Sequence, residues 1–251
     1  MSKTNNKKLL CIIPARAGSE AIKNKNELLI GDYSLVERAL FVANGSKYID
    51  KIIVSTNSDD IIDKVNTYGN FAPFKRPDEI SSSLSPSIDF MNHAIDWAEN
   101  NDNCIYDYIV LLEPPCPFRL PIHIDECYER ALQNNITSLV SVIEVGDNHP
   151  IRMTKLNSNN ELISFHQEEP DGLRRQDQDK VYIRNTAVYI FTRSTIKKGN
   201  IWGDRKFGYV MDEKLYGINI DEPIDYLLAK TFYDWCKDND ILDQIEYIHQ
   251  F

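Results

Sequence analysis

Hydrophobic residues in the first part of the chain fall into two alternating kinds of segment. Short runs that are almost continuously apolar or β-branched are typical of strands buried on both faces of a sheet. These runs are residues 9–13, 51–56, 108–112 and 138–145. Apolar side chains three and four positions apart predict helices at residues 35–44, 59–68, 87–100 and 121–134. The alternation predicts βαβ units with right-handed crossovers, and therefore a mostly parallel sheet.

The second part of the chain has a different pattern. Two short segments flank an Asn/Ser-rich turn and predict a β-hairpin, and a polar stretch after them predicts an excursion from the core or part of an interface. The hairpin is expected at residues 152–156 and 161–165, the polar stretch at 167–180, further strands at 188–192, 209–211 and 216–220, and a final amphipathic helix at 223–238. We therefore expect one α/β domain spanning residues 1–251, with a β-rich insertion at about residues 150–185.

The order of the elements also predicts where a ligand binds. In an open parallel sheet, ligands lie beyond the carboxyl ends of the strands, where the crossovers diverge. Functional residues are therefore expected directly after Ile13, Thr56, Leu112 and Ile220.

Composition supports a folded protein and narrows its class of ligand. Hydrophobic residues make up 42% of the 251 positions, which is enough for a core and excludes pervasive disorder. The 28 Lys and Arg against 38 Asp and Glu give a net charge of −10. Such a balance argues against nucleic acid and against an anionic membrane surface as partners. A small anionic ligand remains possible, because a local group of cations can outweigh the overall field.

Targeting signals and cysteines point to the cytoplasm. No apolar run is long enough to span a bilayer, and the apolar run that follows Lys7 and Lys8 ends too early for a signal peptide. The five cysteines are odd in number and lack metal-type spacing, so we expect reduced thiols. They are Cys11, Cys104, Cys116, Cys127 and Cys236.

The loop after the first predicted strand carries the strongest chemical signal. Its small residues, among them Ala15, Gly18 and Ser19, allow backbone N–H groups to approach an anion closely. Arg16, Lys23 and Lys25 add three cations, which match a polyphosphate in charge. The spacing fits neither a Walker A loop nor a dinucleotide-binding fingerprint, and a merely solvated basic loop is the alternative interpretation.

Eight segments, in order along nearly the whole chain, resemble the CMP-sialic acid synthetase family, the cytidylyltransferases that activate nonulosonic acids. They are IPARAGSEAIKNKN (13–26), VSTNSDDI (54–61), FKRPDEISS (74–82), YDYIVLLEPPCPFR (106–119), SLVSVIEVGDNHP (138–150), RRQDQ (174–178), NTAVYI (185–190) and INIDEPIDYLLA (218–229). The resemblance implies a Rossmann-like, three-layer α/β nucleotidyltransferase fold with a small β-rich dimerisation insertion, and a homodimer.

The resemblance also implies a reaction. The anomeric 2-hydroxyl of a nonulosonic acid of the sialic, legionaminic or pseudaminic type attacks the α-phosphorus of CTP, giving a CMP-sugar and pyrophosphate. Mg²⁺, or Mn²⁺ in its place, neutralises charge on the phosphate oxygens. A nucleotidyltransferase for another sugar or nucleotide, and a non-catalytic nucleotide-binding homologue, are the alternatives.

The family pattern assigns roles to particular residues of this sequence. Arg16, Lys25 and Asp221 are the expected catalytic residues, and Asp221 with Asn219 the expected metal ligands. Nucleotide-binding residues are expected at Ala15, Arg16, Gly18, Ser19, Lys25, Asn26, Arg76 and Ser82. Acceptor-binding residues are expected at Glu113, Arg152, Arg175, Asn185 and Tyr189, with Arg175 as a partner for the acceptor's carboxylate.

Several positions depart from the family pattern, among them Pro115-Cys116 in place of Thr-Ser, Arg184 one place later than the usual arginine, and the four that follow. Glu20 replaces a lysine and reverses the charge beside the expected triphosphate, and Glu113 replaces a glutamine. Asn219 replaces the first aspartate of a D-I-D pair, which we expect on one face of a strand with Asp221. Thr186 stands where glycine is common. These changes predict an altered substrate or a weakened metal site on an unchanged fold.

Overall fold

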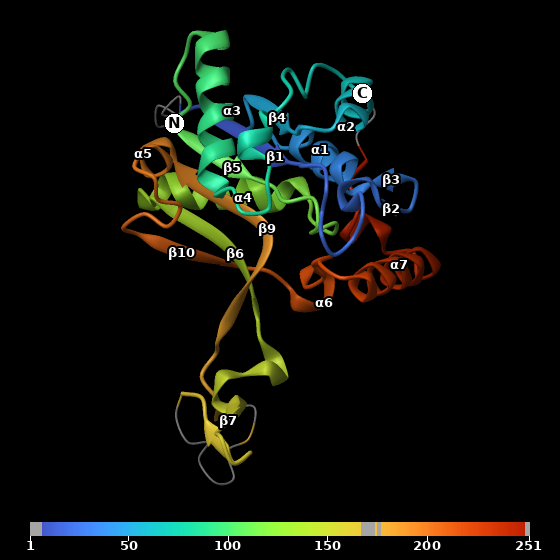
Figure 1. Ribbon diagram of the computed structural model, residues 1–251, viewed down its shortest axis with the longest axis vertical. Coiled ribbons are helices and arrows are strands. Elements are labelled where there is room, and N and C mark those ends of the chain that lie inside the picture. The colour runs from blue at the N-terminus through green and yellow to red at the C-terminus, as the bar shows by residue number, and fades with distance from the viewer. Residues whose placement is uncertain (1–6, 167–173, 175–176, 249–251) are drawn as a thin grey trace.

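The computed structural model describes residues 7–166, 174 and 177–248 and has a six-stranded sheet at its centre (Figure 1). The strand order is β10-β6-β9-β5-β1-β4. Their bounds are β1 Leu9–Pro14, β4 Lys51–Ser55, β5 Tyr108–Leu111, β6 Ser138–Glu144, β9 Tyr182–Thr192 and β10 Lys206–Val210. Strand β9 is antiparallel to β5 and β6, and every other pairing in this sheet is parallel. The predicted mostly parallel sheet is confirmed.

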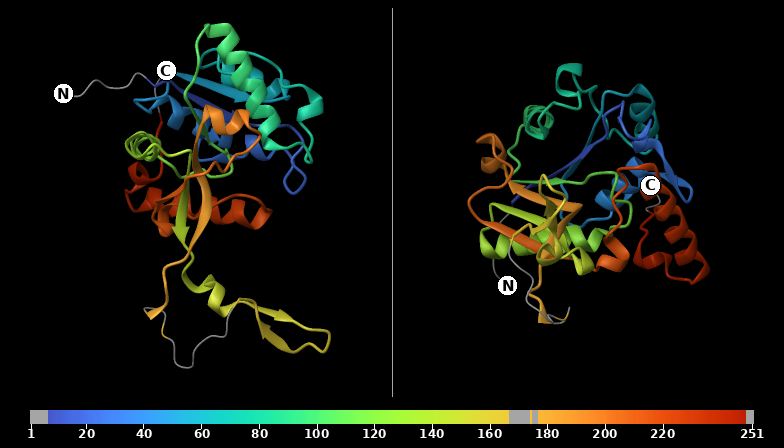
Figure 2. Two further views of the ribbon diagram at one scale, coloured as in Figure 1. Left: turned by 90° about the vertical axis from the view of Figure 1, so that its left-hand side faces the viewer. Right: turned by 60° about the horizontal axis from the view of Figure 1, so that its bottom comes forward.

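Helices cover both faces of the sheet and make three layers, as Figures 1 and 2 show. Each face of the sheet has its own hydrophobic core, and successive side chains of β1 point to opposite faces. Leu9, Cys11 and Ile13 pack with the buried faces of α1, α2, α4 and α7, whereas Leu10 and Ile12 pack with α3 and α5. The helices are α1 Leu35–Asn44, α2 Asp59–Asn66, α3 Ser87–Asp102, α4 Pro121–Asn134, α5 Arg193–Lys197, α6 Glu213–Tyr216 and α7 Pro223–Asp238.

Local chemistry fixes where several helices begin. Ser34 and Glu37 form a capping box at the start of α1, and Ser58 accepts a hydrogen bond from the backbone of Ile61 at the start of α2. The two-stranded sheet of β2 Leu29–Ile30 and β3 Tyr33–Ser34 leads into α1. Short 3₁₀ helices lie at Lys25–Glu27, Asp78–Ile80, Gly146–Asn148, Pro150–Arg152 and Leu242–Gln244.

The insertion forms an arm that projects from the rest of the molecule, which we call the body (Figure 1). Strands β6 and β9 run out of the central sheet, and the described part of residues 145–181 extends from their far ends. The predicted hairpin is confirmed as β7 Thr154–Leu156 paired with β8 Leu162–Ser164. Much of the polar stretch at 167–180 lies outside the described residues.

One predicted element is wrong. Residues 216–220 were expected as a strand, but α6 ends at Tyr216 and the segment from Gly217 to Ile220 is irregular. The apolar side chain of Ile220 is fully buried in the core although the segment pairs with no described strand, and this burial explains the strand-like pattern. Among the described residues, no helix combines the length and the apolar character that crossing a membrane requires.

Candidate functional site

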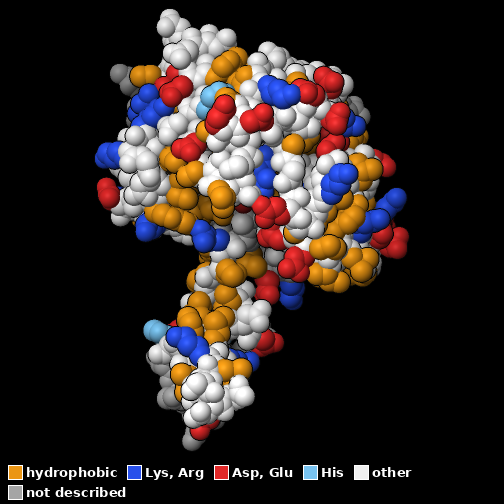
Figure 3. Space-filling view, in the orientation of Figure 1, with side chains coloured by type: hydrophobic (Ala, Val, Ile, Leu, Met, Phe, Trp, Pro, Cys, Tyr) orange, Lys and Arg blue, Asp and Glu red, His pale blue; other side chains and the backbone are white. Residues whose placement is uncertain are grey.

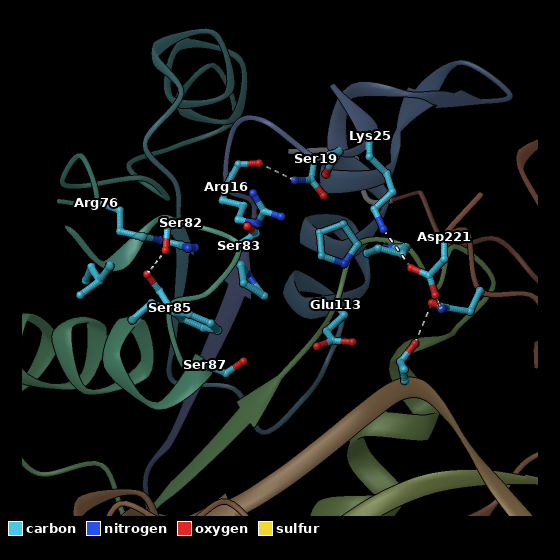
Figure 4. Close-up of a pocket in the computed structure, with 18 residues that line it drawn as sticks. Arg16, Ser19, Lys25, Arg76, Ser82, Ser83, Ser85, Ser87, Glu113 and Asp221 are labelled. Atoms are coloured by element: carbon cyan, nitrogen blue, oxygen red, sulfur yellow. Dashed lines mark hydrogen bonds and ion pairs between the residues drawn. The ribbon is translucent and has the colours of Figure 1, made fainter. Parts of the chain in front are cut away.

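A cavity of about 370 Å³ lies beyond the carboxyl ends of β1 and β5. It is lined by the loop after β1, the segment between β4 and α3 with the first turn of α3, the loop after β5, the middle of β9 and the residues before α7. Its lining includes Arg16, Ser19, Lys25, Asn26, Arg76, Ser82, Ser83, Ser85, Ser87, Phe90, Glu113, Thr186, Asn219 and Asp221. Figure 4 shows Arg76, Ser82, Ser83 and Ser85 on one side, Lys25 and Asp221 on the other, and the Glu113 carboxylate between them.

The loop after β1 is held in shape by its own polar groups. The Arg16 guanidinium donates to the carbonyl of Gly18 at 2.8 Å, and the Asn26 amide donates to the carbonyl of Arg16 at 3.1 Å. Gly18 has a φ of +72°, a conformation that glycine adopts without strain. Ala15 is buried and donates its N–H to the carbonyl of Ser55. Ala15 and Gly18 therefore shape the loop, while the Arg16 and Lys25 side chains face the cavity.

Arg76 is a buried cation on the cavity wall. Only 3% of it is exposed, and its guanidinium donates to the hydroxyl and the carbonyl of Ser55. Its charge lies 4.7 Å from the centre of the Phe90 ring. Burial, with a smaller contribution from Arg16, lowers the pKa of Arg76 to about 10, so the side chain is still charged at neutral pH. A buried charge with few partners is suited to bind an anion.

The opposite side of the cavity carries a series of hydrogen-bonded side chains. Lys25 Nζ lies 3.0 Å from Asp221 Oδ1, and Asn219 Nδ2 lies 2.5 Å from Asp221 Oδ2. The Thr186 hydroxyl lies 2.9 Å from Asn219 Oδ1. Asn219 and Asp221 are thus neighbours although the segment that carries them is not a strand.

Glu113 faces the same space from the loop after β5. Burial raises the pKa of its carboxyl, Arg119 opposes this shift, and Asp221 adds to it. Arg119 is fully buried and donates to the carbonyls of Ala187 and Glu113, both at 2.8 Å. Glu113 is thereby fixed at the cavity wall beside a buried cation.

Three residues expected to bind the acceptor do not line this cavity. Asn185 is buried, and its amide donates to the carbonyl of Tyr216 at 3.1 Å. Tyr189 is also buried and stacks near Phe191, and burial with the Glu113 charge raises its pKa to about 12. Arg152 lies on the arm, where it is 3.4 Å from Asp147. Arg175, the fourth, lies outside the described residues.

The sequence also left some lining residues unassigned. Ser83, Ser85 and Ser87 join Ser82 on the wall that Arg76 begins, and the Ser82 and Ser85 hydroxyls lie 2.7 Å apart. The signal that could have found them is the run SSSLSPS at residues 81–87, which leads into the predicted helix that starts at Ser87. Glu20, in contrast, is exposed and is not part of the cavity lining.

Asn57 is a further residue that sequence reasoning did not assign. Its side-chain oxygen accepts from the backbone N–H of Ala17 at 2.8 Å, and its amide donates to Asp78 at 3.2 Å. It therefore ties the loop after β1 to the segment that follows Arg76. A position directly after the second strand was expected to be functional, which was the signal for it.

Within the described residues, no group of three or more His, Cys, Asp or Glu side chains is arranged to hold a metal ion. A cation in the cavity would therefore depend on one or two carboxylates and on oxygen atoms from a substrate.

Known proteins are similar to this chain over nearly its whole length. A pseudaminic acid cytidylyltransferase of Campylobacter jejuni (strain 81-176) is 30% identical over 228 residues, which cover 90% of this chain and 96% of that protein. An N-acylneuraminate cytidylyltransferase of Escherichia coli O18:K1:H7 is 27% identical over 250 residues, 96% of this chain but 56% of that longer protein.

The fold has a solved counterpart. A CMP:2-keto-3-deoxy-manno-octonic acid synthetase in complex with CTP superposes with a TM-score of 0.67 and 13% identity, covering 91% of this chain and 99% of the other. At that identity the likeness concerns the fold alone. The family model described as cytidylyltransferase matches residues 10–250. With nearly its whole length matched, the chain belongs to the cytidylyltransferase family.

Proposed function

We propose that the protein transfers a cytidylyl group from CTP to a nonulosonic acid. The anomeric 2-hydroxyl of the acid attacks the α-phosphorus and loses its proton to solvent. The bond between the α-phosphorus and the oxygen that bridges to the β-phosphorus breaks, and pyrophosphate leaves with that oxygen. One observation carries the proposal: a single cavity in a cytidylyltransferase chain presents Arg16, Lys25 and Arg76 around a space that Glu113 and Asp221 also face.

The cations have separate tasks in this scheme. Arg16 and Lys25 come from the loop after β1 and bind the triphosphate, together with Ser19 and the backbone near Gly18. Their charge stabilises the negative charge that develops on the leaving pyrophosphate. Arg76, with Ser82 on the adjoining wall and Asn26 below the loop, binds the nucleoside side of CTP.

The residues present also fit a divalent cation. Asp221 and Glu113 direct carboxylates at one cavity in which a triphosphate would supply further oxygens, and Mg²⁺ is usually held in this way. We therefore propose Asp221 as the principal ligand for Mg²⁺ or Mn²⁺, with Glu113 facing it and Asn219 beside it. When bound, the ion neutralises phosphate charge and helps orient the α-phosphorus.

The acceptor is proposed from the relatives. They carry the names of pseudaminic acid and N-acylneuraminate enzymes, so the acceptor class is a nonulosonic acid, with the sialic, legionaminic and pseudaminic types all open. Glu113 and Thr186 line the same cavity and have no task in binding CTP in this scheme, so we assign them to the acceptor. Tyr189 and Asn185 support that wall from the buried side.

We also propose a homodimer. Arg152 lies on the arm, away from the cavity of its own chain, and Arg175 belongs to the same insertion in sequence. Cations on the arm can reach an acceptor if the arm packs against a second copy. Hydrophobic side chains gather along the arm in Figure 3, which supports such packing.

Pyrophosphate release tests the reaction. Purified protein would be mixed with Mg²⁺ and CTP plus each nonulosonic acid, with UTP, GTP and ATP as controls. Release with CTP and one acid is the expected result and identifies the acceptor. Release with another nucleotide would replace CTP in the proposal. CTP binding without any release would favour a non-catalytic homologue.

A matched pair of lysine variants tests the assignment of the loop. Lys25→Met is expected to lower the rate of pyrophosphate release about 10²- to 10³-fold, because a cation aimed at the developing charge is lost. Lys23→Met removes an exposed lysine of the same loop that does not line the cavity, and is expected to change the rate less than about threefold. Equal effects of the two variants would contradict the role of Lys25.

A further inference from the structure

A chain of hydrogen bonds leads from β9 to the carboxylate of Asp221. The Thr186 hydroxyl lies 2.9 Å from Asn219 Oδ1, and Asn219 Nδ2 lies 2.5 Å from Asp221 Oδ2. Lys25 Nζ lies 3.0 Å from the other oxygen of the same carboxylate. Both oxygens of Asp221 are thus held, one by a charge and one by an amide.

The chemistry of the groups fixes the direction of this chain. The Asp221 carboxylate, paired with Lys25, only accepts hydrogen bonds, so the edge of the Asn219 amide that faces it is the NH₂ group. The amide oxygen then faces Thr186, whose hydroxyl donates to it. Asp221 therefore sets which way the Asn219 amide is turned, and the Thr186 hydroxyl adds a second hydrogen bond that holds the amide there.

The backbone of Thr186 has a conformation that its side chain disfavours. Its φ is +59°, and the five other described non-glycine residues with positive φ are all Asn or Asp. A β-branched residue is strained in this left-handed region. Thr186 lies where the pairing of β9 with β6 shifts register, in the segment between Arg184 and Tyr189.

Neighbouring polar groups hold this irregular segment of β9 in place. The Val188 N–H donates to the hydroxyl of Ser141 on β6 at 2.8 Å, and the buried Asn185 amide donates to the carbonyl of Tyr216 at 3.1 Å. The surroundings therefore impose the strained conformation, and its result is that the Thr186 hydroxyl stands at the cavity wall beside Asn219.

We propose that Thr186 and Asn219 are positioning residues, which orient Asp221 toward a divalent cation, and that Asn219 is not itself a ligand. If Asn219 Oδ1 and Asp221 were to share one ion, the amide would have to turn its oxygen toward the carboxylate. It would then lose its hydrogen bond to Asp221 and reverse the direction of the one to Thr186. The inference rests on the proposed function for the role of the ion, and on the geometry alone for the roles of Thr186 and Asn219.

Binding of Mn²⁺ tests the proposal without turnover. The free Mn²⁺ signal in electron paramagnetic resonance would be titrated with protein in the presence of CTP. Thr186→Val keeps the shape and the β-branch but removes the hydroxyl, and is expected to weaken Mn²⁺ binding about three- to tenfold. Thr186→Ser restores the donor and is expected to bind within about twofold of the wild type. Asp221→Asn is expected to abolish binding at this site.

A double-variant cycle separates positioning from ligation. Once Asn219→Ala has removed the amide, adding Thr186→Val is expected to cause no further loss, since the hydroxyl acts only through Asn219. Thr231→Val, at an exposed threonine of α7 that bonds to the carbonyl of Leu227, is the matched control and is expected to bind Mn²⁺ like the wild type.

Several results would overturn the proposal. These are wild-type affinity in Thr186→Val, additive losses in the double variant, or loss of Mn²⁺ binding in Asn219→Ala as complete as in Asp221→Asn. Thermal unfolding of each variant shows whether a loss of Mn²⁺ binding is due to misfolding. If Thr186→Val is misfolded, the Mn²⁺ affinity of Thr186→Ser decides whether the hydroxyl is needed. Pyrophosphate release separates the two hypotheses: Mn²⁺ binding that depends on Thr186 without release from any acid would leave the positioning chain intact and refute the proposed function.

Discussion

The body and the arm of this protein differ in how completely a single chain buries their apolar side chains. In the body, the apolar side chains of β1 and α1 are almost completely buried, Phe41 for example at 1% exposure. On the arm, Leu156, Leu162 and Phe165 are each more than half exposed. Both regions are rich in hydrophobic residues, but only the body packs them within one chain.

This difference suits the two regions to different tasks, folding for the body and contact with another molecule for the arm. Burial of apolar surface within the body provides the free energy of folding. Exposed apolar side chains on a two-stranded hairpin contribute little to folding, and a patch of them on a projecting element is typical of a contact surface. The body therefore carries the cavity and its cations, while the arm carries an exposed apolar surface and Arg152, which the proposed homodimer would use.

A matched pair of phenylalanines gives the largest expected contrast. Phe41→Ala is expected to lower the free energy of unfolding by about 3–5 kcal/mol, because it leaves a cavity in the core. Phe165→Ala on the arm is expected to change it by less than about 0.5 kcal/mol. Urea unfolding at low protein concentration measures both. A similar loss in the two variants would mean that the arm is part of the folding core.

The buried body also makes the free energy of unfolding depend on pH, through His123. His123 is 7% exposed, and burial lowers its pKa to about 4, below the value of about 6.5 in an unfolded chain. The unfolded state therefore takes up a proton first as the pH falls from 6.5 to 4, and this costs the folded state about 3 kcal/mol. Urea unfolding from pH 7.5 to 4.5 should show a flatter decline for His123→Gln. An unchanged slope would contradict the assignment.

Assembly is the property that the arm should control. Leu162→Asp places a charge on the exposed hairpin, and is expected to weaken association by about 2 kcal/mol or more and so favour monomers. Ile105→Asp, at a body residue of similar exposure (63%), is the control and should leave the mass unchanged. Light scattering during size-exclusion chromatography provides the readout. Dimers that persist in Leu162→Asp would assign the contact to another surface.

Backbone strain gives the smallest expected effect. Thr186→Gly in the body removes a β-branched residue from a φ of +59° and is expected to raise the free energy of unfolding by about 1 kcal/mol, even though the cavity loses its hydroxyl. Asn160→Gly on the arm, at a φ of +62°, should change it by less than about 0.5 kcal/mol, since Asn tolerates this region. Thermal unfolding compares the two. A marked destabilisation in Thr186→Gly would show that Thr186 is not strained.

Much of the fold was predictable because the body's segments have clear periodicity. The runs at β1, β4 and β5 and the helical spacing of α3 and α4 were expected within a few residues of their observed bounds. The segment before α7 was not, because the apolar residues Tyr216 and Ile220 are buried by packing rather than by pairing in a sheet. Burial alone does not distinguish these two cases in a sequence.

The sequence by itself determined the chemical character of the site. A loop of small residues and cations after a buried strand indicates an anion, and Arg16 and Lys25 do face one cavity. The ordered motifs indicated the family. These features are local, because each depends on residues that are close together along the chain.

Only the tertiary structure decided how distant residues combine. The family resemblance named Arg76, but its guanidinium reaches the cavity wall only because residues after β4 return to Ser55. Thr186 meets Asn219 because an irregular segment of β9 lies beside the segment before α7. The same packing turns Asn185 into the interior and keeps Arg152 out on the arm. No local pattern encodes these contacts, since they follow from the order of strands in the sheet and from hydrogen bonds between segments 20 or more residues apart.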